Sequence, residues 1–357
     1  MLSSLHGGDV VAVAERLGVS PDSLTDFSAN INPLGMPDTL RQALHGQLDL
    51  AQPYPDIDYR ALHRALAAHH RLAPDWVVAG NGETELIFNL VEALQPRQAL
   101  LLTPGFAEYR RALLRFGCTP RDYTLQAETG FAVDARLLAA ISADLDCVFL
   151  CTPNNPTGLT VSPDLLLAVA ERCQQLGVRL IIDEAFWDFI ADEPGAIPLL
   201  ARFPTLCVLR SLTKFYAIAG LRLGYLLSAD PQLTARLRVL RHPWSINAFA
   251  ALAGEQVLSD DDYRRRTLAW LAQERPWLQT ALQALPDLTV WPGRANYLLL
   301  RCERPALDLQ QALLAHGLLI RSCANYPGLD ARYYRVCVRL RHDNARLIAA
   351  LHTILAC

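Results

Sequence analysis

The chain has 357 residues, of which 52% are hydrophobic and 19% are charged, and its formal net charge is −3. This length allows a large buried core and suggests about two domains, at roughly 150 residues each. The small net charge and the lack of a long charged run argue against a nucleic-acid-binding surface or a basic membrane-binding patch.

Export and metal binding are not indicated either. The start, "MLSSLHGGDVVAVAERLG", lacks a basic region followed by an apolar stretch, so no signal peptide is expected. No run of ~18 uncharged apolar residues could span a bilayer. The nine cysteines are scattered and form no CxxC pair. We therefore expect a cytoplasmic protein with reduced cysteines and no structural metal.

Short apolar runs alternate with helical patterns from residue 36 to residue 260. Strands are expected at 76–80, 99–103, 146–151, 179–183 and 206–211, and helices at 83–94 and 163–177. Strands that are apolar throughout are typical of a parallel sheet covered on both faces. The alternation predicts a large α/β domain over 36–260.

The rest of the chain has a different pattern. A long helix is expected at 260–285, strands at 297–301, 318–322 and 333–340, a helix at 308–317, and a last helix from Asn344. These elements predict a smaller α+β domain, formed by 261–357 together with an N-terminal arm, 1–35.

Polar residues follow the predicted strands at their carboxyl ends, where open α/β sheets bind ligands. They are "NGETE" (81–85), "TPNNPTG" (152–158), Asp183 and "SLTK" (211–214). The helix that starts near Glu83 presents free backbone N–H groups, which suit a phosphate. Each stretch alone could be an ordinary turn. Together they provide a phosphate site, a carboxylate, an amide and an amine at one edge.

Lys214 is the only lysine among the 33 lysines and arginines. A coding preference for arginine could leave one lysine by chance. However, an arginine cannot lose its proton, whereas a lysine amine can form a Schiff base. Pyridoxal 5′-phosphate needs such an amine for its aldehyde, a carboxylate for its ring nitrogen and cationic groups for its phosphate. The sequence therefore predicts this cofactor.

The stretches "NGETE", "PGFAEY", "NNPTG", "DEAF" and "SLTKFYAIAGLRLGY" resemble the fold-type I pyridoxal phosphate enzymes, the aspartate aminotransferase superfamily. The resemblance implies a large cofactor domain with a mostly parallel seven-stranded sheet, a smaller α+β domain, and a homodimer with shared active sites. It implies that Lys214 forms the Schiff base, Asp183 pairs with the ring nitrogen and Asn155 contacts the ring oxygen O3′. The further cofactor contacts it implies are Ser211 and Arg222 with Gly82, Glu83 and Thr84 at the phosphate, Phe106 on the ring, and Tyr54 at the phosphate of the neighbouring subunit. One departure is Phe186, where the family often has a tyrosine that contacts O3′.

Two groups within this superfamily act on phosphate-bearing amino compounds: histidinol-phosphate aminotransferases and the threonine-phosphate decarboxylases of cobalamin biosynthesis. The stretches "HGGD" (6–9), "DFSANINPLG" (26–35) and "LIRSCANYPGL" (319–329) resemble the decarboxylases more. This implies decarboxylation of O-phospho-L-threonine to 1-aminopropan-2-ol O-phosphate. The expected substrate contacts are His6, Asn32, Arg321 and Arg335.

Three alternatives can be compared with this reading. Amino transfer stays open, because the difference between the two reactions is one of substrate orientation. A nicotinamide-dependent oxidoreductase would need GxGxxG, and "GNGETE" has only two of the glycines. A transcriptional regulator with this fold would need a DNA-binding domain, for which 357 residues leave no room.

Overall fold

The computed structural model of the chain describes residues 7–191 and 193–356. Its largest sheet has the strand order β2-β8-β7-β6-β5-β3-β4. All strands run parallel except β8, which is antiparallel to both neighbours. The mostly parallel seven-stranded sheet is therefore confirmed. Its strands are β2 Val77–Asn81, β3 Gln98–Thr103, β4 Thr119–Thr124, β5 Cys147–Cys151, β6 Arg179–Asp183, β7 Leu206–Ser211 and β8 Leu223–Ser228.

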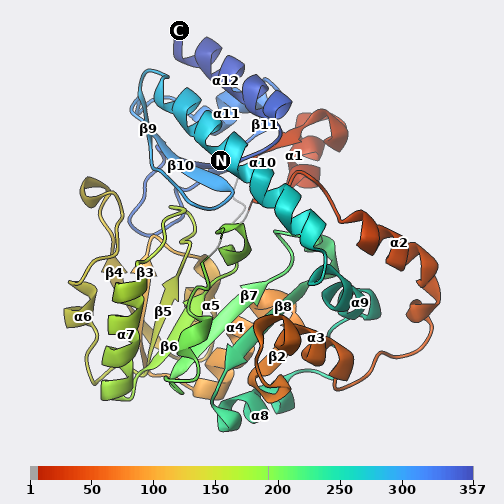
Figure 1. Ribbon diagram of the computed structural model, residues 1–357. Helices are drawn as coiled ribbons and strands as arrows, with labels where there is room; N and C mark the ends of the chain where they lie inside the picture. The colour runs from red at the N-terminus through yellow and green to blue at the C-terminus, as the bar shows by residue number, and fades with distance from the viewer. Residues whose placement is uncertain (1–6, 192, 357) are drawn as a thin grey trace.

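Helices cover both faces of this sheet (Figure 1). Side chains alternate between the faces along each strand, so Ile181 and Leu209 belong to one apolar cluster while Ile182 and Val208 belong to another. The first face is covered by α4 Gly82–Leu94, α5 Ala107–Arg115 and α8 Pro231–Leu240. The second face is covered by α3 Arg60–His70, α7 Pro163–Leu176 and α9 Ala248–Val257, with α2 Asp38–Gly46 against α9 and α6 Leu137–Ala140 against α7.

The smaller domain is built on an antiparallel sheet in the order β12-β13-β10-β9. A short parallel pair, β1 with β11, joins the N-terminal arm to it. Figure 1 shows the C-terminal elements of this part, in blue, above the large sheet, with α10, in cyan, extending down toward α9. Its elements are α1 Val10–Leu17, β1 Thr25–Asp26, α10 Asp261–Gln283, β9 Leu288–Val290, β10 Tyr297–Cys302, α11 Leu309–Leu314, β11 Leu318–Leu319, β12 Arg321–Ser322, β13 Tyr333–Cys337 and α12 Arg341–Ala356.

The strands of the large sheet and those of the smaller sheets are separated by the predicted boundaries at residues 36 and 260. All seven strands of the large sheet lie within 36–260, and the strands of the smaller sheets lie outside that range. Within the described residues, no helix combines the length and the hydropathy needed to cross a bilayer. The eight described cysteines are buried and free.

Candidate active site

Lys214 lies in the loop that follows β7, at the carboxyl edge of the large sheet. Its amine Nζ is 2.9 Å from the Ser211 hydroxyl and 3.3 Å from a carboxylate oxygen of Glu83. The amine also lies 5.5 Å from the centre of the Phe186 ring. The lysine side chain is 24% exposed. The amine is therefore held in place and still open to a reactant.

Asp183 ends β6 with its side chain buried, and its charge and that of Lys214 both act on the Glu83 carboxyl. One carboxylate oxygen accepts the backbone N–H of Ala185 at 2.8 Å. The other accepts the hydroxyl of Tyr109, from α5. Burial, followed by the charge of Asp183, raises the pKa of Tyr109 well above its usual value. The phenol therefore keeps its proton and donates a hydrogen bond to Asp183. Two hydrogen bonds thus fix the direction of the Asp183 carboxylate.

The start of α4 forms an anion cradle beside Lys214. Gly82 has a φ of +76°, and a Cβ at this position would lie 2.6 Å from the guanidinium nitrogen Nη2 of Arg222. A Cβ at Gly224 would lie 2.6 Å from the backbone N of Glu83. Close packing therefore brings the N-terminal N–H groups of the helix and one guanidinium to the same place, an arrangement that suits a phosphate. Thr84 lies on the same helical turn, half-buried.

Asn155 connects this edge of the sheet to the smaller domain. Its side-chain oxygen accepts Nη1 of Arg335 at 2.6 Å and the hydroxyl of Tyr326 at 3.2 Å. An amide oxygen occupied by two donors leaves the NH₂ group as the part that can bind a further acceptor. Asn155 is therefore oriented as a hydrogen-bond donor.

Arg321 and Arg335 face each other as partners in the antiparallel pair β12–β13. Both are about 5% exposed, which is rare for arginine. Arg321 donates to Asn325 at 2.8 Å, and Arg335 donates to the Ser28 carbonyl at 2.7 Å. The Nε of Arg335 is buried, and no partner for it occurs among the described residues. Two buried guanidinium groups side by side suit a ligand with anionic groups.

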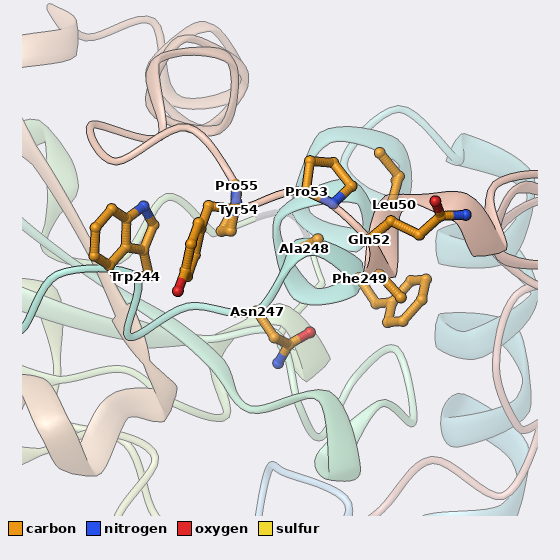
Figure 2. A pocket seen from close by; sticks show the side chains of 10 residues that line it. Leu50, Gln52, Pro53, Tyr54, Pro55, Trp244, Asn247, Ala248 and Phe249 are labelled. Atoms are coloured by element: carbon orange, nitrogen blue, oxygen red, sulfur yellow. The ribbon is translucent and has the colours of Figure 1, made fainter.

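The two aromatic residues predicted to contact the cofactor, Phe106 and Tyr54, lie in different parts of the structure. Phe106 immediately precedes α5, with its ring edge-on to Tyr109 at 5.6 Å, next to Asp183. Tyr54 is 78% exposed and stacks on Trp244 at 4.5 Å. Figure 2 shows Tyr54 and Trp244 in a surface pocket together with the start of α9. None of the residues lining this pocket is Lys214, Glu83 or Asp183.

The side chain of Asn32 forms hydrogen bonds with other residues of the chain. The amide NH₂ lies 2.8–2.9 Å from acceptors on Phe215, Tyr263 and Thr267, and the amide oxygen accepts the N–H of Leu34. Its backbone N–H donates to the carbonyl of Lys214 at 3.1 Å. Asn32 thus supports the lysine loop, and its contact with substrate stays a prediction.

His6 lies outside the described residues. The following Gly8 donates its N–H to the hydroxyl of Ser28 at 2.8 Å, and the carbonyl of the same serine accepts Arg335. The described end of the "HGGD" stretch therefore lies beside one of the two buried arginines.

The comparison with known families agrees with this geometry. The family described as "Aminotransferase class I and II" matches residues 22–354. The chain belongs to this family.

Several members of the aminotransferase family resemble the chain over nearly its full length. "Threonine-phosphate decarboxylase" of Salmonella typhimurium is 55% identical over 355 residues, which cover 99% of this chain and 98% of that protein. The solved histidinol-phosphate aminotransferase from Clostridium acetobutylicum has a TM-score of 0.87 at 28% identity, covering 92% of this chain and 98% of its own. L-threonine-O-3-phosphate decarboxylase from Porphyromonas gingivalis has a TM-score of 0.83 at 25% identity, covering 93% and 99%.

Membership of the aminotransferase family implies pyridoxal 5′-phosphate, and the residues present fit it. The amine of Lys214 suits its aldehyde, and the oriented carboxylate of Asp183 suits its ring nitrogen. Gly82 leaves room in front of the Arg222 guanidinium, where a side chain would collide. The Glu83 oxygen Oε1 is buried without a partner among the described residues, which marks this pocket as one with unmet polar groups.

Three side chains of this family member were not predicted: Tyr109, Tyr326 and the carboxyl group of Glu83. Tyr109 lies three residues after Phe106, one helical turn along "PGFAEY", so helical spacing could have indicated it. Tyr326 stands in the quoted stretch "LIRSCANYPGL" without any spacing signal. Glu83 was expected to contribute its backbone, whereas its side chain also reaches Lys214.

Proposed function

We propose that this chain converts O-phospho-L-threonine into 1-aminopropan-2-ol O-phosphate and carbon dioxide, for the side arm of cobalamin. The near-full-length identity of 55% with the Salmonella decarboxylase supports this reaction. The structural observation that carries the proposal is the pair of buried arginines, Arg321 and Arg335, of which Arg335 binds Asn155 at the carboxyl edge of the large sheet. The buried, unpaired cysteines support a reducing, cytoplasmic setting.

The residues of the chain divide the work as follows. The amine of Lys214 would hold the cofactor through its aldehyde, and the same amine would supply the proton that Cα needs after carbon dioxide has left. Asp183 keeps a proton on the ring nitrogen, held in position by Tyr109. Bound pyridoxal 5′-phosphate supplies an electron sink for the bond that breaks at Cα.

Further residues hold the cofactor in place. Gly82, Glu83 and Thr84 offer the start of α4 to the phosphate, with Arg222 and Ser211 beside them. Asn155 donates to the ring oxygen O3′ through its NH₂ group. Phe106 covers the ring. With the cofactor held by these contacts, the orientation of the substrate would depend on Arg321 and Arg335.

The choice between decarboxylation and amino transfer depends on orientation. The residues that bind the anionic groups of the substrate would decide which bond at Cα is placed for breaking. Threonine phosphate has a carboxylate and a phosphate, and Arg321 and Arg335 bind these two ends with forked, charge-assisted hydrogen bonds. This arrangement would favour loss of the carboxylate over loss of the Cα hydrogen.

We further propose a homodimer in which Tyr54 reaches the cofactor phosphate of the neighbouring subunit. Its side chain is 78% exposed, an unusual state for a large aromatic residue. It lies with Trp244 around a surface pocket of about 340 Å³ (Figure 2). A second copy that covers this surface would bury both rings and complete the phosphate site.

A comparison of three substrate mixtures distinguishes decarboxylation from amino transfer. Amino transfer is the second candidate because the fold resembles that of the Clostridium aminotransferase. The purified holoenzyme is incubated with O-phospho-L-threonine, with L-threonine, and with histidinol phosphate plus 2-oxoglutarate. We expect carbon dioxide from the first and little from the second, because threonine leaves the phosphate-binding groups unpaired. Brisk glutamate formation from the third, with no carbon dioxide from the first, would establish the aminotransferase instead.

A further inference from the structure

Glu83 has a buried carboxyl group that a phosphate cradle does not require. The backbone of the helix start serves the phosphate, while the side chain turns inward and is only 7% exposed. One of its oxygens, Oε2, lies 3.3 Å from Nζ of Lys214. The other, Oε1, is buried, and no group among the described residues donates a hydrogen bond to it. A protonated carboxyl could use this oxygen as a donor.

The surroundings favour that protonated form. Burial raises the pKa of Glu83 to about 8, and the charge of Asp183 adds to this, while the Lys214 ammonium acts in the opposite direction. Two other titratable groups of the same pocket, Tyr109 and Cys151, have pKa values raised well above their usual ranges by burial, so both are neutral near pH 7. Among the described residues, the charges that act most on Glu83 are those of Asp183 and Lys214.

Decarboxylation places a demand on this pocket that amino transfer does not. The carboxylate leaves as carbon dioxide, the electron pair of the broken bond stays on Cα, and a proton must be added there. The balance is R–COO⁻ + H⁺ → R–H + CO₂, so each turnover consumes one proton. Amino transfer moves a proton already present on the substrate. A decarboxylase site needs a proton store next to the amine that delivers the proton.

We propose that the Glu83 side chain is that store: it holds a proton beside Lys214 and restores it to the lysine amine after the amine has protonated the substrate Cα. An N–H bond of Lys214 breaks as the C–H bond forms. The O–H bond of Glu83 then breaks as the amine regains its proton, and Glu83 is protonated again from solvent. Glu83 is thus a positioning residue that acts through Lys214. The inference rests on the proposed decarboxylation.

The first test follows the absorbance of the holoenzyme, in which the bond between Lys214 and the cofactor is coloured, as a function of pH. The Glu83→Gln variant keeps the shape of the side chain and removes the proton that the carboxyl can give up. We expect the spectroscopic pKa to fall, because Glu83 becomes an anion as the pH rises through about 8 and then stabilises the protonated nitrogen beside it, whereas glutamine cannot ionise. Glu83→Asp should recover part of the shift. A pKa equal to that of the unmodified protein in Glu83→Gln overturns the pairing.

The second test uses the full-length apoprotein and the fact that Lys214 is the only lysine. Trinitrobenzenesulfonate labels unprotonated amines, and peptide mapping separates Lys214 from the N-terminus. We expect the midpoint of labelling to move to lower pH in Glu83→Gln. The matched control is Glu85→Gln on the same helical turn, where the carboxylate accepts the N–H of Asn81 at 2.6 Å and the hydroxyl of Ser245. An equal shift in both variants would refute a specific role for Glu83.

The third test connects the pocket to turnover. The kcat for O-phospho-L-threonine should fall as pH rises through about 8, since Glu83 then loses its proton. In Glu83→Gln we expect kcat to be lower by roughly 100-fold, as for loss of a general acid, with KM little changed and this high-pH fall removed. An unchanged high-pH fall in Glu83→Gln would overturn the proposal. If no variant releases carbon dioxide, the proposed function fails, while the first two tests still decide whether Glu83 and Lys214 are coupled.

Discussion

Truncation of Arg335 tests how the site orients its substrate. The side chain is about 5% exposed, and its two terminal nitrogens hold Asn155 at 2.6 Å and the Ser28 carbonyl at 2.7 Å. Removing one partner of a buried, hydrogen-bonded charge pair costs about 2–5 kcal/mol. If the transition state bears that loss, Arg335→Ala lowers kcat/KM by about 30-fold to 5,000-fold.

Part of the effect falls on the fold and must be separated from the effect on substrate. Loss of Arg335 leaves the Ser28 carbonyl without this donor, at a cost of about 1–3 kcal/mol in the free energy of unfolding. Asn155 keeps the hydroxyl of Tyr326 at 3.2 Å. Urea denaturation measures this loss. The matched control is Arg339→Ala, which also removes a bond to a backbone carbonyl, that of Asp26 at 3.0 Å, and should leave kcat/KM nearly unchanged.

The double variant with Arg321→Ala completes the experiment. The two arginines are partners across β12 and β13, and together they fix one orientation of the substrate. Once either is lost, the other holds a misplaced substrate, so the two losses in kcat/KM should not add. The reasoning is refuted if Arg335→Ala costs no more than Arg339→Ala, or if the losses add to within about 0.5 kcal/mol, as for independent sites.

Three further predictions address the cofactor. Borohydride reduction should fix the cofactor on the peptide that contains Lys214, and Lys214→Arg should lose both this label and turnover; a label on the N-terminal amine would contradict the assignment. Asp183→Asn should lower kcat by about 100-fold or more with the cofactor still bound, since a loss of about 3 kcal/mol has that effect, and Tyr109→Phe should lower it less; near-normal turnover in Asp183→Asn would refute the role. Tyr54→Phe should weaken cofactor binding without changing the sedimentation coefficient, whereas Trp244→Ala should shift a dimer toward monomer; a chain that is monomeric at all concentrations would contradict both expectations.

Five strands of the large sheet, β2, β3, β5, β6 and β7, could be predicted from their apolar runs, whereas β8 Leu223–Ser228 was not predicted although it is buried between β2 and β7. Runs such as "DCVFLC" contain almost no polar residue, and β5 and β6 follow the expected ranges closely. The edge strand β4 has the sequence "TPRDYT", and only its inner side meets another strand. Proline and charged residues are tolerated on such an edge. An apolar pattern therefore could not identify it.

The site could be predicted where chemistry follows directly from position along the chain. Asp183 is the last residue of β6 and Lys214 lies in the loop that follows β7, so the edge they share was predictable. The hydrogen bond between Asn155 and Arg335 joins residues 180 positions apart, and no local pattern encodes such a contact. Asn32 shows a different limit, because a buried amide that supports a loop has the same residue type as one that binds a ligand.

A carbon balance with labelled substrate is the most direct test of the proposed decarboxylation. O-phospho-L-threonine carrying ¹³C in its carboxyl group is incubated with the holoenzyme, and bicarbonate and 1-aminopropan-2-ol O-phosphate are measured by nuclear magnetic resonance. The account predicts that both form in equal amounts, with all of the label in bicarbonate and with solvent deuterium added at C1 of the product in heavy water. Label that remains in a 2-oxo acid, or a substrate that is not consumed, would contradict it.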